Sequence, residues 1–319
     1  PQAVVVAELC HIRSSVASRR VASQPPSAAM PRLAAMLALL GGATALTRPR
    51  VIIAPAQFGT PKDYDKLVSD LLQRGHPAVR VAPLSRFDWL KIVPSVFTKA
   101  FWLGELRPAP TLRFYFEALD EAFADVGDGE DVALLGHSIG GWVLRAYVAA
   151  RPGNGAKVRR LVTLGTPHNP PPSGFFSAID QTRGLLSYIN ANCPPDPAVV
   201  TCVAGDATWT PTIFDLFQRR PWEEAQRRSP LLESLVSLPS YAVLAGSGDP
   251  FQIKGDGLIP VQTALLAGCP SIVVDAHHAD FVPTALESIK LPETYPWFGS
   301  DGILDAWADA LAMPLAKRP

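Results

Sequence analysis

The strongest candidate for a catalytic residue in this sequence is a serine in a tight, glycine-rich turn. The run Gly136-His-Ser-Ile-Gly140 has the pattern G-x-S-x-G. Such a serine is a nucleophile when a buried strand precedes it and a helix follows, because the sharp turn between them exposes its hydroxyl. Glycines two residues before and after it let strand and helix approach without Cβ clashes. Ser138 is therefore the candidate nucleophile, and the backbone N–H of Ile139 is a candidate oxyanion donor.

A nucleophilic serine needs a base that takes its proton and an acid that orients the base. Two histidines, His277 and His278, follow the last expected strand. We prefer His278 as the base because it lies deeper in the loop, and His277 is the alternative. For the acid we prefer Asp256, which glycines flank on both sides, over Asp249, which follows an apolar segment more directly. The chain order Ser, Asp, His is one of those known for such triads.

A second oxyanion donor is expected in the turn after the first strand, at the backbone N–H of Gln57 or Phe58. His168 also lies near a strand end, but it precedes both acids, so we interpret it as a structural or site-lining histidine. The cysteines lack metal-ligand spacing. Cys193 and Cys202 bracket a proline-rich loop, and they form either a disulfide or two unrelated thiols.

Alternating strands and helices must position these residues. Buried strands are expected at 51–54, 78–83, 132–135, 159–164, 199–204 and 271–275, and helices at 63–74, 111–126, 142–150 and 301–313. Strand–helix–strand units at this spacing predict an α/β fold with a mostly parallel sheet and helices on both faces. The candidate residues follow expected strand ends, where open α/β sheets bind their ligands.

One segment interrupts the alternation. Residues 86–110 contain several prolines together with Phe87, Trp89, Phe97 and Trp102. They predict either a packed surface loop or a wall over an apolar substrate cleft.

Composition narrows the class of partner. The 319 residues carry 29 basic and 29 acidic side chains with no basic stripe, which argues against nucleic acid. No apolar run reaches the length of a membrane span. Residues 1–50 are rich in Ala, Ser and Arg, and Met30–Leu46 has the charge and length pattern of a signal peptide. We expect a targeting leader at 1–50, addressed to the plastid or the secretory route, and one folded domain at 51–319.

With these residues in place, the chain resembles the lipase-like α/β-hydrolases, in particular a plant, algal and cyanobacterial group related to PGAP1-type lipases. The matching segments are 136–142, 161–168, 180–184, 202–205, 255–260 and 297–300. The resemblance implies an α/β-hydrolase fold with a cap-like insertion, an acid at Asp256 and a base at His278. One departure is Pro55-Ala56, where such lipases have His-Gly or Pro-Gly, so a Cβ at this point is expected to shift the oxyanion loop. Some lipases bind calcium near the His loop, where Asp280 lies, but no second ligand is evident and we expect no metal or other cofactor.

The leading hypothesis is a serine hydrolase of carboxylic esters that acts on a small-molecule acyl ester or lipid, with peripheral membrane contact and a role in lipid metabolism. The alternatives are an acyltransferase or thioesterase on the same triad, and a non-catalytic scaffold with this fold.

Overall fold

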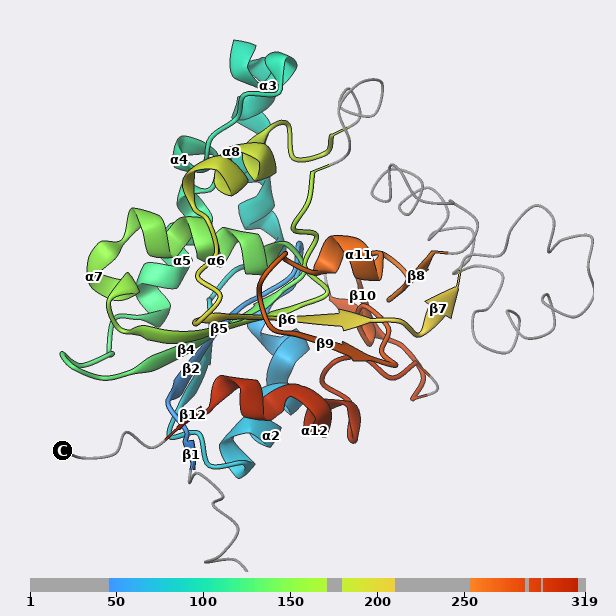
Figure 1. The fold of residues 1–319 in the computed structure, drawn as a ribbon. Coiled ribbons are helices and arrows are strands. Elements are labelled where there is room, and N and C mark those ends of the chain that lie inside the picture. The colour runs from blue at the N-terminus through green and yellow to red at the C-terminus, as the bar shows by residue number, and fades with distance from the viewer. Residues whose placement is uncertain (1–45, 171–179, 210–252, 285–286, 294, 315–319) are drawn as a thin grey trace, which may run out of the picture. The chain divides into compact units, whose positions relative to one another are not determined.

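A six-stranded parallel sheet organises the fold in the computed structural model, which describes residues 46–170, 180–209, 253–284, 287–293 and 295–314 (Figure 1). From edge to edge the strands are β3 (Val79–Val81), β2 (Arg50–Ala54), β4 (Val132–His137), β5 (Val158–Leu164), β6 (Val200–Gly205) and β9 (Ser271–Val274). Every neighbouring pair is parallel. The expected α/β class and all six expected strands are confirmed.

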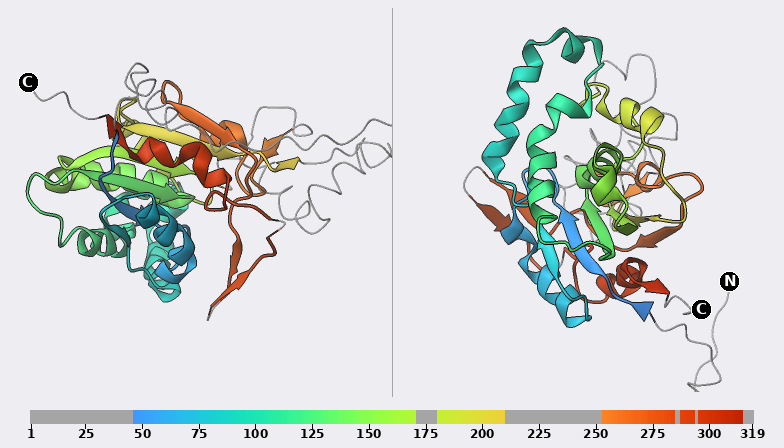
Figure 2. Two further views of the ribbon diagram at one scale, coloured as in Figure 1. Left: turned by 90° about the horizontal axis from the view of Figure 1, so that it is seen from below. Right: turned by 90° about the vertical axis from the view of Figure 1, so that its left-hand side faces the viewer.

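Helices cover both faces of this sheet (Figures 1 and 2). On one face lie α5 (Arg113–Ala122), α6 (Ile139–Ala150) and α8 (Leu185–Asn192); on the other lie α2 (Asp65–Gln73), α12 (Ile303–Trp307) and the 3₁₀ helix η4 (Ala308–Leu311). Successive residues of β2 point to opposite faces, so Val51 and Ile53 pack with α2 and α12 while Ile52 packs with α5 and α6. Because both faces are covered, the central strands β2 and β4 are apolar over almost their whole length rather than alternating.

The order of the strands places a crevice beside β2 and β4. The chain runs from β2 through α2 to β3 at the edge, and then returns to β4 on the other side of β2. Such a reversal leaves room for a ligand outside the carboxyl ends of the two central strands. Ala54 at the end of β2 is paired with Gly136 near the end of β4, so the turns that follow these strands are neighbours.

An insertion between β3 and α5 forms the cap-like part of the fold (upper part of Figure 1). It consists of the 3₁₀ helix η2 (Arg86–Phe97) and the short helices α3 (Lys99–Leu103) and α4 (Pro108–Thr111). With three residues per turn, side chains three apart in η2 share a face. Trp89 is buried and Ile92 packs against the core, whereas Phe87, Leu90 and Val93 are exposed. The insertion therefore has an apolar inner face and an apolar outer face.

Short elements complete the described chain. The two-stranded pairs are β1 (Leu46–Thr47) with β12 (Met313–Pro314), β7 (Thr208–Trp209) with β8 (Lys254–Gly255), and β10 (Phe281–Pro283) with β11 (Ser288–Lys290). The remaining short helices are η1 (Pro61–Tyr64), α7 (Pro152–Gly155) and α11 (Val261–Ala264). The closing helix is shorter than the expected 301–313, because Gly302 has a positive φ of 79° and the chain is extended again at Ala312. Among the described helices, none has the length and apolar character that crossing a membrane requires.

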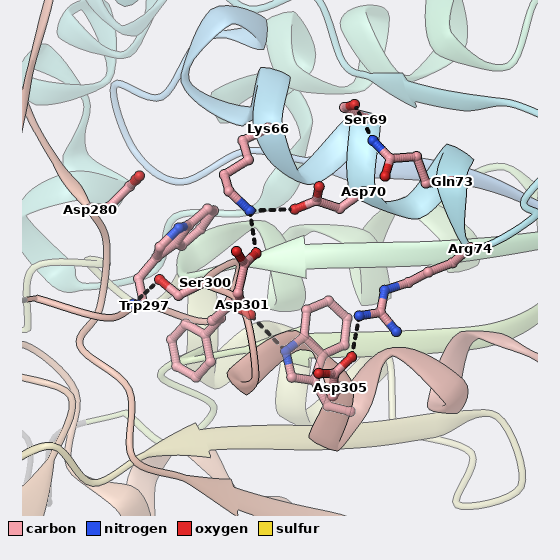
Figure 3. A network of polar contacts seen from close by, with 12 residues as sticks. Lys66, Ser69, Asp70, Gln73, Arg74, Asp280, Trp297, Ser300, Asp301 and Asp305 are labelled. Carbon is pink, nitrogen blue, oxygen red and sulfur yellow. Dashed lines mark hydrogen bonds and ion pairs between the residues drawn. The ribbon is translucent and has the colours of Figure 1, made fainter. Parts of the chain in front are cut away.

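A network of polar contacts fastens the C-terminal segment to α2 (Figure 3). Lys66 Nζ contacts Asp301 at 2.6 Å, and Arg74 pairs with Asp305. These charges are exposed, so each pair contributes at most about 1 kcal/mol. The larger contribution comes from Trp307, which is buried and donates its indole N–H to the Phe298 carbonyl at 2.8 Å. The ion pairs with α2 and the Trp307 hydrogen bond together hold the 297–305 segment in place.

Candidate active site

Ser138 occupies the sharp turn between β4 and α6. Its backbone angles, φ 55° and ψ −128°, lie in a region that a non-glycine residue enters only under constraint. The neighbouring glycines make the turn feasible. A Cβ on Gly136 would lie 2.4 Å from the Gly141 Cα, and a Cβ on Gly140 would lie 2.3 Å from the Ala54 carbonyl oxygen. The expected strand–turn–helix context of the serine is present.

Asp256 and His278 form a buried hydrogen-bonded pair. The His278 Nδ1 lies 2.7 Å from Asp256 Oδ2, and the His278 backbone N–H donates to the Asp256 carbonyl at 2.7 Å. The other carboxylate oxygen accepts the backbone N–H groups of Leu258 at 3.0 Å and Ile259 at 2.7 Å. A carboxylate held by three donors has little freedom to turn. It requires the proton of the His278 ring on Nδ1 and leaves Nε2 able to accept one.

Gly165, which directly follows β5, packs closely against this pair. Its φ is +51°, and a Cβ there would lie 2.4 Å from Asp256 Oδ2 and 3.1 Å from His278 Nδ1. Any larger residue would displace the carboxylate or the ring.

Ser138 and His278 line the same cavity, which has a volume of about 310 Å³. Its wall contains Ser138, Ile139, His278 and Gln57. Apolar side chains from the cap, α6 and α8 line much of the remainder, and a polar stretch at 180–183 also contributes; the apolar residues include Trp89, Ile92, Phe101, Trp142, Leu185 and Leu186. The inner face of segment 86–110 is thus a cavity wall. Within the described residues, no hydrogen bond joins the Ser138 hydroxyl to the His278 ring; the two meet only as lining of the same space.

His277, the alternative base, lies apart from this arrangement. Its Nδ1 contacts the Pro296 carbonyl at 3.1 Å and its ring packs on Tyr295, with centroids 5.2 Å apart. Burial lowers its pKa. His277 does not line the cavity, whereas His278 does. Asp249, the alternative acid, lies outside the described residues.

The turn after β2 distinguishes the two candidate oxyanion residues. Gln57 lines the cavity, while Phe58 turns outward with φ 61° and packs on Trp89 at 5.6 Å. The N–H of Ile139 begins α6, and the first N–H groups of a helix have no partner inside it. The geometry therefore places Gln57 and Ile139, rather than Phe58, on the wall beside Ser138.

Comparison with known proteins adds a family match to this geometry. Residues 120–184 match the family described as "PGAP1-like alpha/beta domain". Three of the segments that suggested the PGAP1 resemblance, 136–142, 161–168 and 180–184, lie inside the match, and the resemblance is confirmed there. The chain has an α/β-hydrolase fold.

Solved structures with similarity to this α/β-hydrolase fold include three esterases and thioesterases. A metagenomic carboxyl esterase is 12% identical over 82% of this chain and 75% of its own, with a TM-score of 0.45. Polyneuridine aldehyde esterase is 21% identical over 47% and 50%, with a TM-score of 0.29. The thioesterase domain from the curacin biosynthetic pathway is 17% identical over 46% of both chains, with a TM-score of 0.28. The chain spans about half the length of the last two. No curated protein matches the sequence.

His168, interpreted from the sequence as a structural or site-lining histidine, lies in the core. It is fully buried and contacts Thr163 Oγ1 through Nε2 at 3.1 Å, and burial lowers its pKa to about 3. Its carbonyl accepts a hydrogen bond from Asn190 Nδ2 at 2.9 Å. The cavity wall includes its neighbours Pro167 and Asn169 but not His168.

Of the cysteines in the described ranges, Cys193, Cys202 and Cys269 are all free thiols, so the disulfide considered for Cys193 and Cys202 is not formed. Asp280, considered for calcium, pairs with Lys290 at 3.2 Å.

Sequence reasoning missed three residues of this site: Tyr64, His137 and Gly165. The signal for His137 is a histidine inside an apolar strand, since a buried polar ring needs a hydrogen-bond partner. No sequence signal identifies that partner.

Proposed function

We propose that this protein is a serine hydrolase of carboxylic esters, with Ser138 as nucleophile, His278 as base and Asp256 as the acid that orients it. One observation carries the proposal: His278, which is hydrogen-bonded to Asp256, and the strained Ser138 turn line a single cavity. The three residues also occur in the chain order of α/β-hydrolases.

The chemistry follows from the protonation of the pair. Ser138 Oγ attacks the ester carbonyl carbon while its proton passes to His278 Nε2. The Ile139 and Gln57 N–H groups stabilise the oxyanion, each such donor being worth about 3–4 kcal/mol. The proton then goes to the departing alcohol, which leaves an acyl-enzyme. Water attacks this acyl group through the same base, and the carboxylic acid and the free serine are released. His278 and Ser138 must approach to hydrogen-bond distance when the substrate binds, as catalytic contacts commonly do.

Acyl lipids are the proposed substrates. The cavity wall is mostly apolar, and a second cavity of about 760 Å³ adjoins it and shares Leu106 and Thr111 with it. This is more space than a short ester fills. An acyltransferase or thioesterase would use the same three residues and differ only in the acceptor or the leaving group.

Labelling with a fluorophosphonate probe tests the proposal. The folded full-length protein is expected to be labelled, peptide mass spectrometry is expected to place the label on Ser138, and the heat-denatured protein is expected to remain unlabelled. A folded protein that takes up no label would overturn the proposal and favour a non-catalytic scaffold. Esters graded in chain length then test the lipid assignment, which fails if only short esters are cleaved.

Contact with a lipid surface is proposed for the outer face of the cap. Phe97 and Trp102 of the cap are 85% and 69% exposed, and Phe87 and Leu90 of the cap are exposed as well. Exposed aromatic side chains of this kind favour the boundary between lipid and water. We expect the protein to sediment with phosphatidylcholine vesicles and Trp102→Ser to weaken this binding. Ile289→Ser, at an exposed apolar residue outside the cap, is the control and is expected to bind as the wild type does; equal binding by both variants and the wild type would contradict the proposal.

A further inference from the structure

A buried chain of hydrogen bonds runs from the turn after β2 to the loop of His278. The Ala56 N–H donates to the Tyr64 hydroxyl oxygen at 2.8 Å. The Tyr64 hydroxyl lies 2.8 Å from His137 Nδ1, and His137 Nε2 lies 2.8 Å from the carbonyl oxygen of His278. Tyr64 and His137 are both fully buried.

The direction of each bond is determined by its ends. A backbone N–H only donates and a carbonyl only accepts, so the Tyr64 proton points to Nδ1 and the His137 ring carries its proton on Nε2. Burial lowers the pKa of His137 to about 3 and raises the pKa of Tyr64, so neither group ionises near neutral pH. This series of hydrogen bonds therefore has a single arrangement of protons, and it neither takes up nor releases a proton near neutral pH.

The chain connects the three parts of the site that must keep a fixed spacing. Ala56 precedes Gln57, the oxyanion candidate on the cavity wall; His137 precedes Ser138; and the last acceptor belongs to His278 itself. A second buried tyrosine acts on the same turn, since the Tyr115 hydroxyl donates to the Pro55 carbonyl. The carbonyl and the N–H of the Pro55–Ala56 peptide are thus both held by tyrosine side chains.

Aromatic packing leaves His137 little freedom to tilt. Its ring centroid lies 5.0 Å from that of His278 and 5.6 Å from that of Trp297. Tyr64 packs edge-on to the same Trp297 at 6.1 Å. The 297–305 segment therefore packs against Tyr64 and His137 through Trp297. Ion pairs with Lys66 of α2 and with Arg74, the residue after α2, hold this segment in place (Figure 3).

We propose that Tyr64 and His137 are positioning residues, which set the distance between the oxyanion donor at Gln57 and the base His278 by one continuous hydrogen-bonded link. The proposal rests on the proposed serine hydrolase function. It assigns a role to the histidine that precedes the nucleophile and to Ala56, whose N–H is already used by Tyr64 and so leaves the next N–H, that of Gln57, for the oxyanion. Ala56, whose Cβ the sequence analysis expected to shift this turn, is buried and has its N–H paired.

Removing the link is expected to lower turnover more than binding. Displacements of about 1 Å among reacting groups can cost about 10²-fold in rate. Tyr64→Phe keeps the ring and deletes the oxygen, so we expect kcat for a soluble ester to fall by about 10- to 100-fold with KM within about twofold of the wild type.

Tyr147→Phe is the matched control. Tyr147 is also fully buried, and its hydroxyl donates to Asp120 at 2.8 Å and accepts from Asn154 at 2.7 Å, away from the cavity wall. It should lose stability as Tyr64→Phe does while keeping kcat within about twofold. If the two variants have the same kcat, the positioning role is wrong even though both proteins fold.

The histidine tests the link from its other end. His137→Gln keeps an amide donor near the position of Nε2, whereas His137→Asn places it near Nδ1 and loses the bond to the His278 carbonyl. We expect the Gln variant to retain about tenfold more kcat than the Asn variant. This pair also serves if Tyr64→Phe does not fold; equal kcat values would overturn the proposal.

A double variant separates one link from two independent contacts. If Tyr64 and His137 act as a unit, Tyr64→Phe combined with His137→Asn should lose no more kcat than the worse single variant. Losses that multiply would overturn the proposal. Failure of the parent function is distinguishable, because a wild-type protein that neither hydrolyses esters nor labels at Ser138 disproves the serine hydrolase itself and this inference with it.

Discussion

Replacing His278 by alanine is expected to lower kcat by about 10⁴-fold or more, whereas His277→Ala should lower it by less than about tenfold. The two histidines are adjacent, but only His278 contacts Asp256 and lines the cavity with Ser138. Without its ring the serine proton has no acceptor, so the whole advantage of the assembled triad is lost at once. Kinetics of the two purified variants on one soluble ester measure the difference.

The His277 variant also controls for damage to the fold. His277 Nδ1 is within hydrogen-bond distance of the Pro296 carbonyl, which also accepts the His277 backbone N–H at 2.7 Å, so the alanine variant loses only the side-chain bond and should lose about 0.5–1.5 kcal/mol of unfolding free energy. We therefore expect His277→Ala to be modestly less stable than the wild type and still active, which shows that a loss of stability does not by itself abolish turnover. If His277→Ala loses as much kcat as His278→Ala, or more, the assignment of the base is wrong.

Strand positions were the most predictable part of this fold. The apolar runs 51–54 and 132–135 are nearly continuous because both faces of the sheet are covered, and β2 and β4 lie within two residues of these limits. The nucleophile turn is equally local, since Gly136, Ser138 and Gly140 are close in sequence. Where a few neighbouring residues determine a structure, the sequence alone predicts it.

The cap was harder to predict because its period differs from that of an α-helix. In η2 the exposed Phe87, Leu90 and Val93 recur every three residues, which is the repeat of a 3₁₀ helix. Each of the two hypotheses for this segment describes one of its faces: the inner face is a cavity wall, and the outer face is exposed as in a surface loop.

The site residues that could not be predicted from the sequence are those that make contacts with residues far away along the chain. Tyr64 and His137 are 73 positions apart, and His137 and His278 are 141 positions apart. Gly165 is a plain strand-end glycine in the sequence, and its need to be glycine follows only from Asp256 and His278 lying above it. None of these pairings leaves a spacing pattern, because the sheet order brings them together.

If Asp256 is the acid of the triad, replacing its carboxylate should also cause a large loss of kcat. Asp256→Asn is expected to lower kcat by about 10⁴-fold with almost no change in melting temperature. The amide oxygen can still accept from the N–H groups of Leu258 and Ile259, so the loop keeps its hydrogen bonds. The amide NH₂ then faces His278 Nδ1 and donates to it. This moves the ring proton to Nε2, the atom that must be free to accept the serine proton.

Asp249→Asn is the matched comparison, since Asp249 is the alternative acid considered in the sequence analysis. It should change kcat by less than about threefold, because the contact of His278 is already made by Asp256. Kinetics and thermal unfolding of both variants give the result. A large loss of kcat in Asp249→Asn with full activity in Asp256→Asn would show that the pair seen here is not the working one. The reverse result, with both melting temperatures unchanged, would mean that the carboxylate acts by holding the imidazole in one tautomer rather than by stabilising the loop.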